Sequence, residues 1–175
     1  VLDMAEEACV AVEGSNTTID LSSNAIATTI PRRAFAGVRR VDVSHQTANP
    51  LVLSPECFAG ISNADLINLK GNRIERVPKH VLGNEETTQW TTGIFDLSAY
   101  GVTRVEDYAF VVADGSDSTA KVDLRCNALY SLSARAFENM VINANDTITL
   151  PVFSPITCYV AQTAEDMTIA LNHVV

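Results

Sequence analysis

The sequence has no long hydrophobic run and no basic leader. No stretch approaches the roughly 20 apolar residues that a transmembrane helix requires. The first residues, with Asp3, Glu6 and Glu7, lack the basic end and the apolar core of a signal peptide. We therefore expect no membrane insertion in this segment. The chain is either cytosolic or has a leader that was removed or lies outside this segment.

Basic residues are also scarce, since 12 Lys and Arg stand against 21 Asp and Glu and give a formal net charge of −9. This charge repels nucleic-acid phosphates and anionic membrane surfaces, so we expect neither as a main partner. Of the 175 residues, 47% are hydrophobic and 19% charged, a balance typical of an ordered chain with a continuous core.

Arrangements typical of catalysis or metal binding are missing as well. The histidines, His45, His80 and His173, fall at unrelated positions and predict neither a metal site nor a cofactor. Asp42, Ser44 and His45 are close in sequence, but such neighbours do not form a catalytic triad without a positioned base. We therefore expect a protein that is not an enzyme.

What the sequence does contain is an apolar, polar, apolar triplet that returns along almost the whole chain. The triplets are Ile19-Asp20-Leu21, Val41-Asp42-Val43, Ile67-Asn68-Leu69, Phe95-Asp96-Leu97, Val122-Asp123-Leu124 and Ile148-Thr149-Leu150. Their intervals are 22, 26, 28, 27 and 26 residues. Self-similarity at such a period predicts a solenoid, in which stacked units share one core.

Two further sets of residues follow each of the first five triplets at nearly fixed distances. The fifth position after the first triplet residue holds Asn24, Gln46, Asn72, Tyr100 and Asn127. An amide at this bend can bond the backbone and its counterpart in the next unit. Ten to twelve residues later come Phe35, Phe58, Leu82, Phe110 and Phe137, which predict an aromatic spine behind the sheet.

These residues resemble the typical extracellular leucine-rich repeat. Asn24-Ala25-Ile26 followed by Ile30 to Val38, and Asn72 to Pro78, match its pattern closely, and Val102 to Phe110 is similar to bacterial and protist surface repeats of the same superfamily. The likeness covers about residues 15–150. It implies an α/β solenoid with a parallel concave sheet of about six to seven strands and short helices or irregular turns on the convex side.

The repeats divide the chain into three parts. Residues 1–16 are expected to form an N-terminal capping segment, with a helix or strand around Cys9 to Val12, although the usual clustered cysteines of such a cap are missing. Residues 17–150 hold the repeats, with strands near 19–21, 41–43, 67–69, 95–97, 122–124 and 148–150. Residues 151–175 form a C-terminal segment with a seventh repeat strand near 169–171.

The middle residues of the triplets are expected to face out of the concave sheet. They form a candidate binding ladder of Asp20, Asp42, Asn68, Asp96 and Asp123, with Ser22, Ser44 and Ser98 beside it. Stacked carboxylates repel one another, which raises their pKa or attracts cations. One interpretation is a site for a basic partner or Ca²⁺. The other, which we favour, is that Asp is common at this consensus position.

Variation in length is confined to the edge that returns to each new strand. It produces two loops, one with Glu85, Glu86 and Trp90 and one with Asp114 and Asp117. Trp90 is a candidate interface anchor, although it can equally fold back over the core. N-glycosylation sequons at Asn16 and Asn145 fall three residues before a triplet, so we expect N-linked glycans on this edge and a secreted or cell-surface location.

The cysteines do not form an obvious disulfide framework. Cys57 and Cys158 fall at inward positions and are expected as buried thiols, whereas Cys126 is expected nearer the surface. If a disulfide exists, the expected pair is Cys126 with Cys158.

Together these features predict a non-catalytic extracellular module that recognises a protein partner through its concave sheet and return-edge loops. The alternative is a structural subunit of an extracellular filament, sheath or surface assembly, in which the partner is another copy of the chain. A third interpretation is a regulatory segment of a larger receptor or enzyme.

Overall fold

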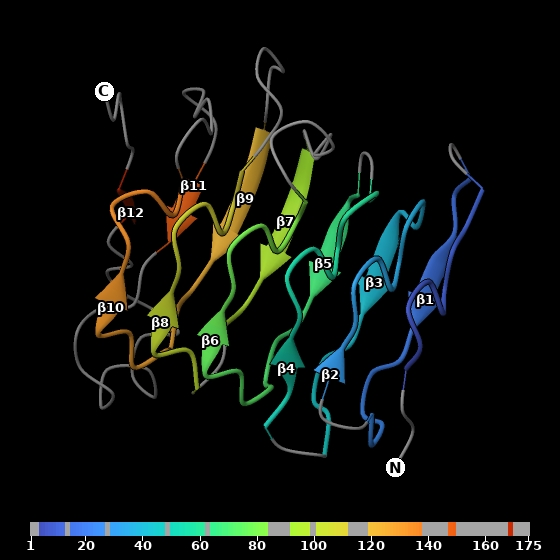
Figure 1. The fold of residues 1–175 in the computed structure, drawn as a ribbon, viewed down its shortest axis with the longest axis horizontal. Helices are drawn as coiled ribbons and strands as arrows, with labels where there is room; N and C mark the ends of the chain where they lie inside the picture. The colour runs from blue at the N-terminus through green and yellow to red at the C-terminus, as the bar shows by residue number, and fades with distance from the viewer. Residues whose placement is uncertain are drawn as a thin grey trace.

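The computed structural model describes residues 4–12, 15–26, 29–47, 50–61, 64–83, 92–98, 101–111, 119–137, 147–149 and 168–169. Strands β1 to β12 in these ranges form three sheets, and the ranges contain no helix. Of the two alternatives expected for the convex side, the structure therefore has turns and short strands. Two rows of strands cross the molecule, with the odd-numbered strands in one row and β2, β4, β6, β8 and β10 in the other (Figure 1).

The longest sheet has seven strands in the order β1-β3-β5-β7-β9-β11-β12. The first six are Thr18–Asp20, Arg40–Asp42, Leu66–Asn68, Thr92–Asp96, Thr119–Asp123 and Thr147–Thr149. Neighbours among them pair in parallel, with Ile19 beside Val41, then Ile67, Phe95, Val122 and Ile148 in register. The six predicted strands are therefore confirmed, and each ends before the last apolar residue of its triplet.

The seventh strand differs from the prediction in direction. β12 (Thr168–Ile169) pairs antiparallel with β11, and Ile148 faces Ile169. A seventh strand therefore joins the sheet near the predicted place, but it is antiparallel, whereas a further repeat unit would add a parallel strand. An antiparallel neighbour can satisfy the same edge donors and acceptors as a parallel one, and the triplet pattern does not distinguish the two.

The opposite row consists of two short parallel sheets. β2 (Thr29–Ile30) pairs with β4 (Val52–Leu53), and β8 (Arg104–Val105) lies between β6 (Arg76–Val77) and β10 (Ser131–Leu132). These strands end in turns whose backbone repeats from unit to unit. Arg33, Glu56, His80 and Tyr108 all have positive φ angles of 54 to 57°. Because an α-helix of L-residues does not continue through a left-handed residue, these turns remain turns.

The N-terminal segment continues this repeating turn, so the expected helix or strand around Cys9 to Val12 is absent. Glu7 has the same left-handed backbone, with a φ of 55°. The Cys9 amide donates to the Ala34 carbonyl at 2.9 Å, as the Phe58 amide donates to Val81 at 3.0 Å. Met4, Cys9 and Ala11 pack on the core. The segment covers the first unit with a turn of the same kind.

The core between the two rows contains a continuous column of phenylalanine rings, in which Phe95 meets its two neighbours edge to face and the other two contacts are stacked. Ring centroids are 5.7 Å apart for Phe35 and Phe58, 5.5 Å for Phe58 and Phe95, 5.6 Å for Phe95 and Phe110, and 5.2 Å for Phe110 and Phe137. The predicted spine is thus present with one change. Where the third unit has Leu82, the strand residue Phe95 bridges the gap between the rings on either side.

Buried amides at the bend after each strand join one unit to the next. The Asn72 side chain accepts a hydrogen bond from the Gln46 backbone N–H at 2.8 Å and donates to the Val43 and Leu69 carbonyls at 2.8 and 2.9 Å. Asn127 donates to Leu97 and Leu124 in the same manner. The predicted role of these amides is confirmed for bonds to the backbone. They hold the ends of successive strands at a fixed spacing.

Candidate functional site

The structure brings the predicted ladder together on the outer face of the long sheet. Asp20, Asp42, Asn68, Asp96 and Asp123 are direct neighbours in register and form what we call the carboxylate row. Asp20 is exposed, whereas the other four are half-buried. Their position is therefore as predicted from the triplets.

Each member of the carboxylate row bonds its own turn. The side-chain oxygen accepts a hydrogen bond from the backbone N–H two residues later, at 2.8 to 3.0 Å. The donors are Ser22, Ser44, Lys70, Ser98 and Arg125 in the order of the row. Such Asx turns satisfy a backbone group that the sheet leaves unpaired at the strand end. The recurrence of Asp and Asn at this position thus has a structural cause.

The pKa of Asp42 is lowered, whereas the stacking of carboxylates was expected to raise it. Burial alone raises its pKa, but hydrogen bonds from the Ser44 side chain and backbone and from Asn68, with nearby His45, lower the pKa below its ordinary value. The unfolded-state value is about 4. Asp42 therefore stabilises the fold fully above that pH, and its contribution is lost as the pH falls through the lower folded-state pKa.

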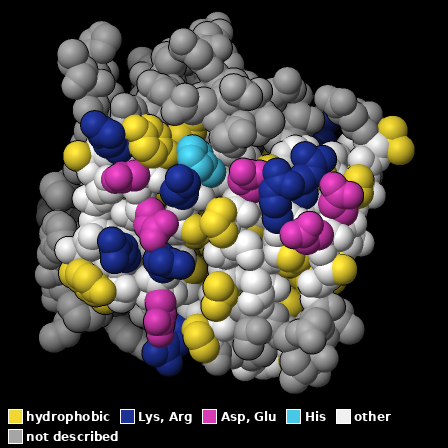
Figure 2. Space-filling model, viewed as in Figure 1, with side chains coloured by type: hydrophobic (Ala, Val, Ile, Leu, Met, Phe, Trp, Pro, Cys, Tyr) yellow, Lys and Arg dark blue, Asp and Glu magenta, His cyan; other side chains and the backbone are white. Residues whose placement is uncertain are grey.

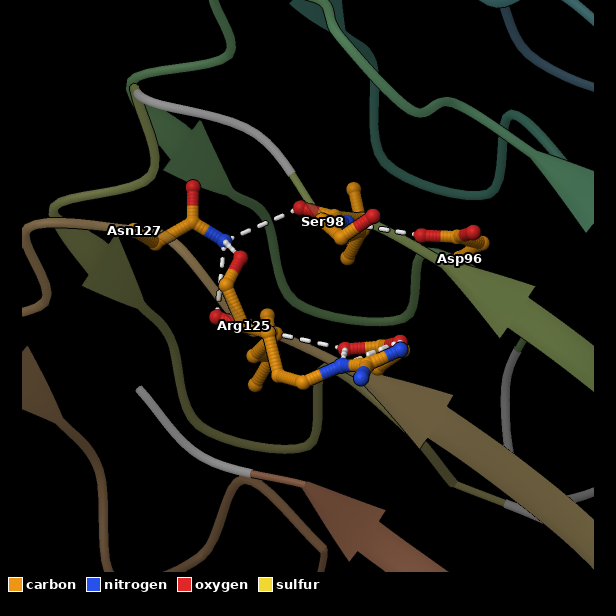
Figure 3. A network of polar contacts seen from close by, with 7 residues as sticks. Asp96, Ser98, Arg125 and Asn127 are labelled. Atoms are coloured by element: carbon orange, nitrogen blue, oxygen red, sulfur yellow. Dashed lines mark hydrogen bonds and ion pairs between the residues drawn. The ribbon is translucent and has the colours of Figure 1, made fainter. Parts of the chain in front are cut away.

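Two other ladder residues are less available to a partner than predicted. Ser44 is only 4% exposed, so it cannot be a contact residue for a partner. Asp123 forms an ion pair with Arg125, with 2.6 Å between Nη2 and Oδ2. Figure 3 shows the end of this row, where Asp96 accepts a hydrogen bond from the Ser98 backbone amide. The Arg125 side chain folds back toward the strand that precedes it, and the Asn127 side-chain amide lies between the two turns. Ser22 and Ser98 are half-buried.

Asp96 allows the structural and electrostatic roles of the row to be separated. We expect Asp96→Ala to destabilise the chain by about 1 kcal/mol, since the Ser98 amide loses its acceptor. Asp96→Asn should cost less, because Asn68 makes the same turn bond in the neighbouring strand. Urea unfolding of both variants measures the difference. Equal losses would show that the charge, and not the turn bond, stabilises the fold.

Sequence reasoning missed a second row on the same face, formed by the residues that precede the triplets. Arg40, Leu66, Ile94 and Lys121 pair in register across four neighbouring strands, and we call them the basic–apolar row. Arg40 and Lys121 are exposed, Leu66 is half-buried, and Ile94 is 41% exposed. Strand alternation gave the signal, because side chains on either side of an inward residue share the outward face.

The outer face of the long sheet is therefore mixed in charge, and not acidic as the ladder alone implied. The carboxylate row contributes Asp20, Asp42, Asp96 and Asp123, while the same face carries Arg40, Lys70, Lys121 and Arg125. A general attraction for cations is not expected from such a surface. Among the described residues, no group of three or more His, Cys, Asp or Glu side chains is placed to hold a metal ion.

Away from this face, most charged side chains stand in pairs. Figure 2 shows dark-blue Lys and Arg side chains beside magenta Asp and Glu side chains, with smaller hydrophobic areas between them. Arg39 bonds Asp65 through two hydrogen bonds, at 3.0 and 3.2 Å, and Arg32 contacts Glu56 at 2.6 Å. Exposed pairs of this kind stabilise a fold by about 1 kcal/mol or less. The Arg39–Asp65 and Arg32–Glu56 pairs join neighbouring units.

Several predicted sites lie outside the described residues. These are the loop residues Glu85, Glu86, Trp90, Asp114 and Asp117, the second sequon at Asn145, and Cys158 with its expected bond to Cys126. Asn16 is described, and it is exposed just before β1. Cys57 is buried as predicted, and burial raises the pKa of its thiol. Cys126 is half-buried in a turn with a φ of 61°.

Comparisons with protein-family models, with curated proteins and with solved structures found no match to this chain. None of the described segments forms a helix long and apolar enough to span a membrane.

Proposed function

We propose that this chain is a leucine-rich-repeat solenoid that acts as a non-catalytic extracellular recognition module. In this proposal, the outer face of the long sheet binds a protein partner together with the return-edge loops that the sequence predicts at residues 83–93 and 113–119. The repeated turns, the buried amides and the phenylalanine rings support the family assignment, because they recur along the chain at the period of the triplets, as in the resemblance noted from the sequence.

The basic–apolar row is the observation that carries the binding proposal. It places a partly exposed apolar pair, Leu66 and Ile94, between two exposed cations on a regular sheet surface. Protein interfaces commonly combine an apolar centre with a polar rim. The carboxylate row next to it is already bonded within its own turns, so it supports the surface and leaves the neighbouring row to make contacts.

The rigidity of this face also favours recognition. Each of the first five strand ends is held by an Asx turn, and the buried amides of Asn72 and Asn127 also bond the preceding unit. A preorganised surface loses less conformational freedom when a partner binds. Affinity can then come from a modest number of contacts.

The binding surface can be located with displayed peptides. We would select binders from a phage library of random 16-residue peptides on the wild-type chain, and then measure their affinity for Ile94→Glu and Val52→Glu. These residues are a matched pair, because Ile94 on the long sheet is 41% exposed and Val52 on β4 is 45% exposed.

Selected peptides should lose at least tenfold in affinity for Ile94→Glu and keep their affinity for Val52→Glu. Peptides that lose affinity only for Val52→Glu, or for neither variant, would contradict the placement of the recognition surface. Concentration-dependent polymers of the wild-type chain in sedimentation would instead favour the structural-subunit alternative.

The extracellular part of the proposal rests on the sequons. Asn16 is exposed, as a glycan attachment site must be. We expect the intact mass of material from the native source to fall after treatment with an N-glycosidase. An unchanged mass, with unmodified Asn16 and Asn145, would remove this support for secretion.

A further inference from the structure

The two cations of the basic–apolar row differ from most arginines of this chain. Arg32, Arg33, Arg39, Arg73, Arg76 and Arg125 each form an ion pair with an Asp or Glu. Within the described residues, Arg40 and Lys121 form none. Asp65 lies near Arg40, but both of its carboxylate oxygens bond Arg39. The row thus presents positive charge that the chain itself neutralises only in part.

The nearby carboxylates do not remove this charge. The Asp42 oxygens bond the Ser44 amide and the Asn68 side chain, and Asp96 bonds the Ser98 amide. Asp123 faces Arg125, with which it forms three hydrogen bonds. These bonds direct the carboxylates along their own turns.

The distance between Arg40 and Lys121 defines the length of the segment that can bind to the row. Arg40 and Lys121 are three strands apart, and neighbouring strands are about 4.8 Å apart, so their backbones are separated by roughly 14 Å. Leu66 and Ile94 fill the interval in register. An extended segment that rises about 3.3 Å per residue covers this length in about four residues. Apolar side chains over the centre remove Ile94 from water, while an acidic group at each end meets a cation.

We propose that the basic–apolar row binds a protein segment in which apolar residues are flanked by two carboxylates about four residues apart. This proposal rests on the proposed function and adds the chemistry of the partner. The preference for carboxylates belongs to this row alone. The chain as a whole carries a net charge of −9, which repels acidic segments.

Three synthetic 12-residue peptides test the preference. They share a central run of three Leu, Ile or Val residues and differ only in the two flanking residues, which are Glu, Gln or Lys. Fluorescence anisotropy with the full chain at low salt should give an affinity at least tenfold tighter for the Glu-flanked peptide than for the Lys-flanked one. The double variant Arg40→Glu with Lys121→Glu should reverse this order.

The matched control is Lys79→Glu with Arg104→Glu, which changes the charge equally at exposed positions away from the long sheet. This control should keep the order of the wild-type chain. If the reversed variant does not fold, Arg40→Gln with Lys121→Gln should reduce the preference for Glu to less than threefold.

Equal or tighter binding of the Lys-flanked peptide to the wild-type chain would overturn this proposal. So would an absence of measurable binding by the Glu-flanked peptide. In either case the proposed function survives if the library-selected peptides still lose affinity for Ile94→Glu. It fails separately if they do not.

Discussion

Replacing Asn72 by Ala is expected to destabilise the chain by about 2–4 kcal/mol. The side chain is 1% exposed and makes three hydrogen bonds to the backbone of two units. Removal of the Asn72 side chain leaves the Gln46 backbone N–H and the carbonyls of Val43 and Leu69 without these partners. Each unsatisfied buried group costs about 1–3 kcal/mol, and relaxation of the bend recovers part of the total. Urea unfolding followed by circular dichroism measures the loss.

Asn24 provides the control at the same position of another unit. Its amide bonds the Leu21 and Ser22 carbonyls, but the residue is exposed, so water can replace the bonds. Asn24→Ala should therefore cost about 1 kcal/mol or less. If both variants lost the same stability, the buried amides would not be what joins the units.

Phe95→Ala is expected to have an effect of similar or greater size, about 3–5 kcal/mol. Phe95 is fully buried and contacts the rings of Phe58 and Phe110, so its loss interrupts the column of rings and leaves a cavity between these two rings. Thermal unfolding of the variant should show a correspondingly lower midpoint.

Two variants show whether continuity of the column of rings matters. Phe95→Leu should recover part of the loss, because it keeps most of the buried volume. Phe137→Ala removes a ring that is half-buried and should cost less than Phe95→Ala. An equal cost for Phe137→Ala and Phe95→Ala would contradict the interpretation of Phe95 as the bridge in the spine.

Much of the fold could be predicted because the period of the triplets determines the register. The pairing of Ile19, Val41, Ile67, Phe95 and Val122 follows directly from it. The direction of β12 could not be predicted, since a single apolar triplet is compatible with either. Phe95 also has two roles, as the inward residue of a strand and as the missing ring of the spine, and only packing revealed the second.

The candidate site was predicted in position more than in role. The middle triplet residues do lie together, but an Asp in this pattern can face a partner or bond its own turn, and sequence alone does not separate the two. The Asx turns show that the second role applies to the first five units. Arg40, Leu66, Ile94 and Lys121 were missed because they differ in type and therefore form no repeating motif.

The most direct test of the recognition surface is an NMR titration of the isotope-labelled chain with a library-selected peptide. The largest chemical-shift changes are expected in β3, β5, β7 and β9, centred on Leu66 and Ile94, with little change in β4, β6 and β8. Changes concentrated in those short strands, with the long sheet unaffected, would contradict the proposal that the outer face of the long sheet binds the partner.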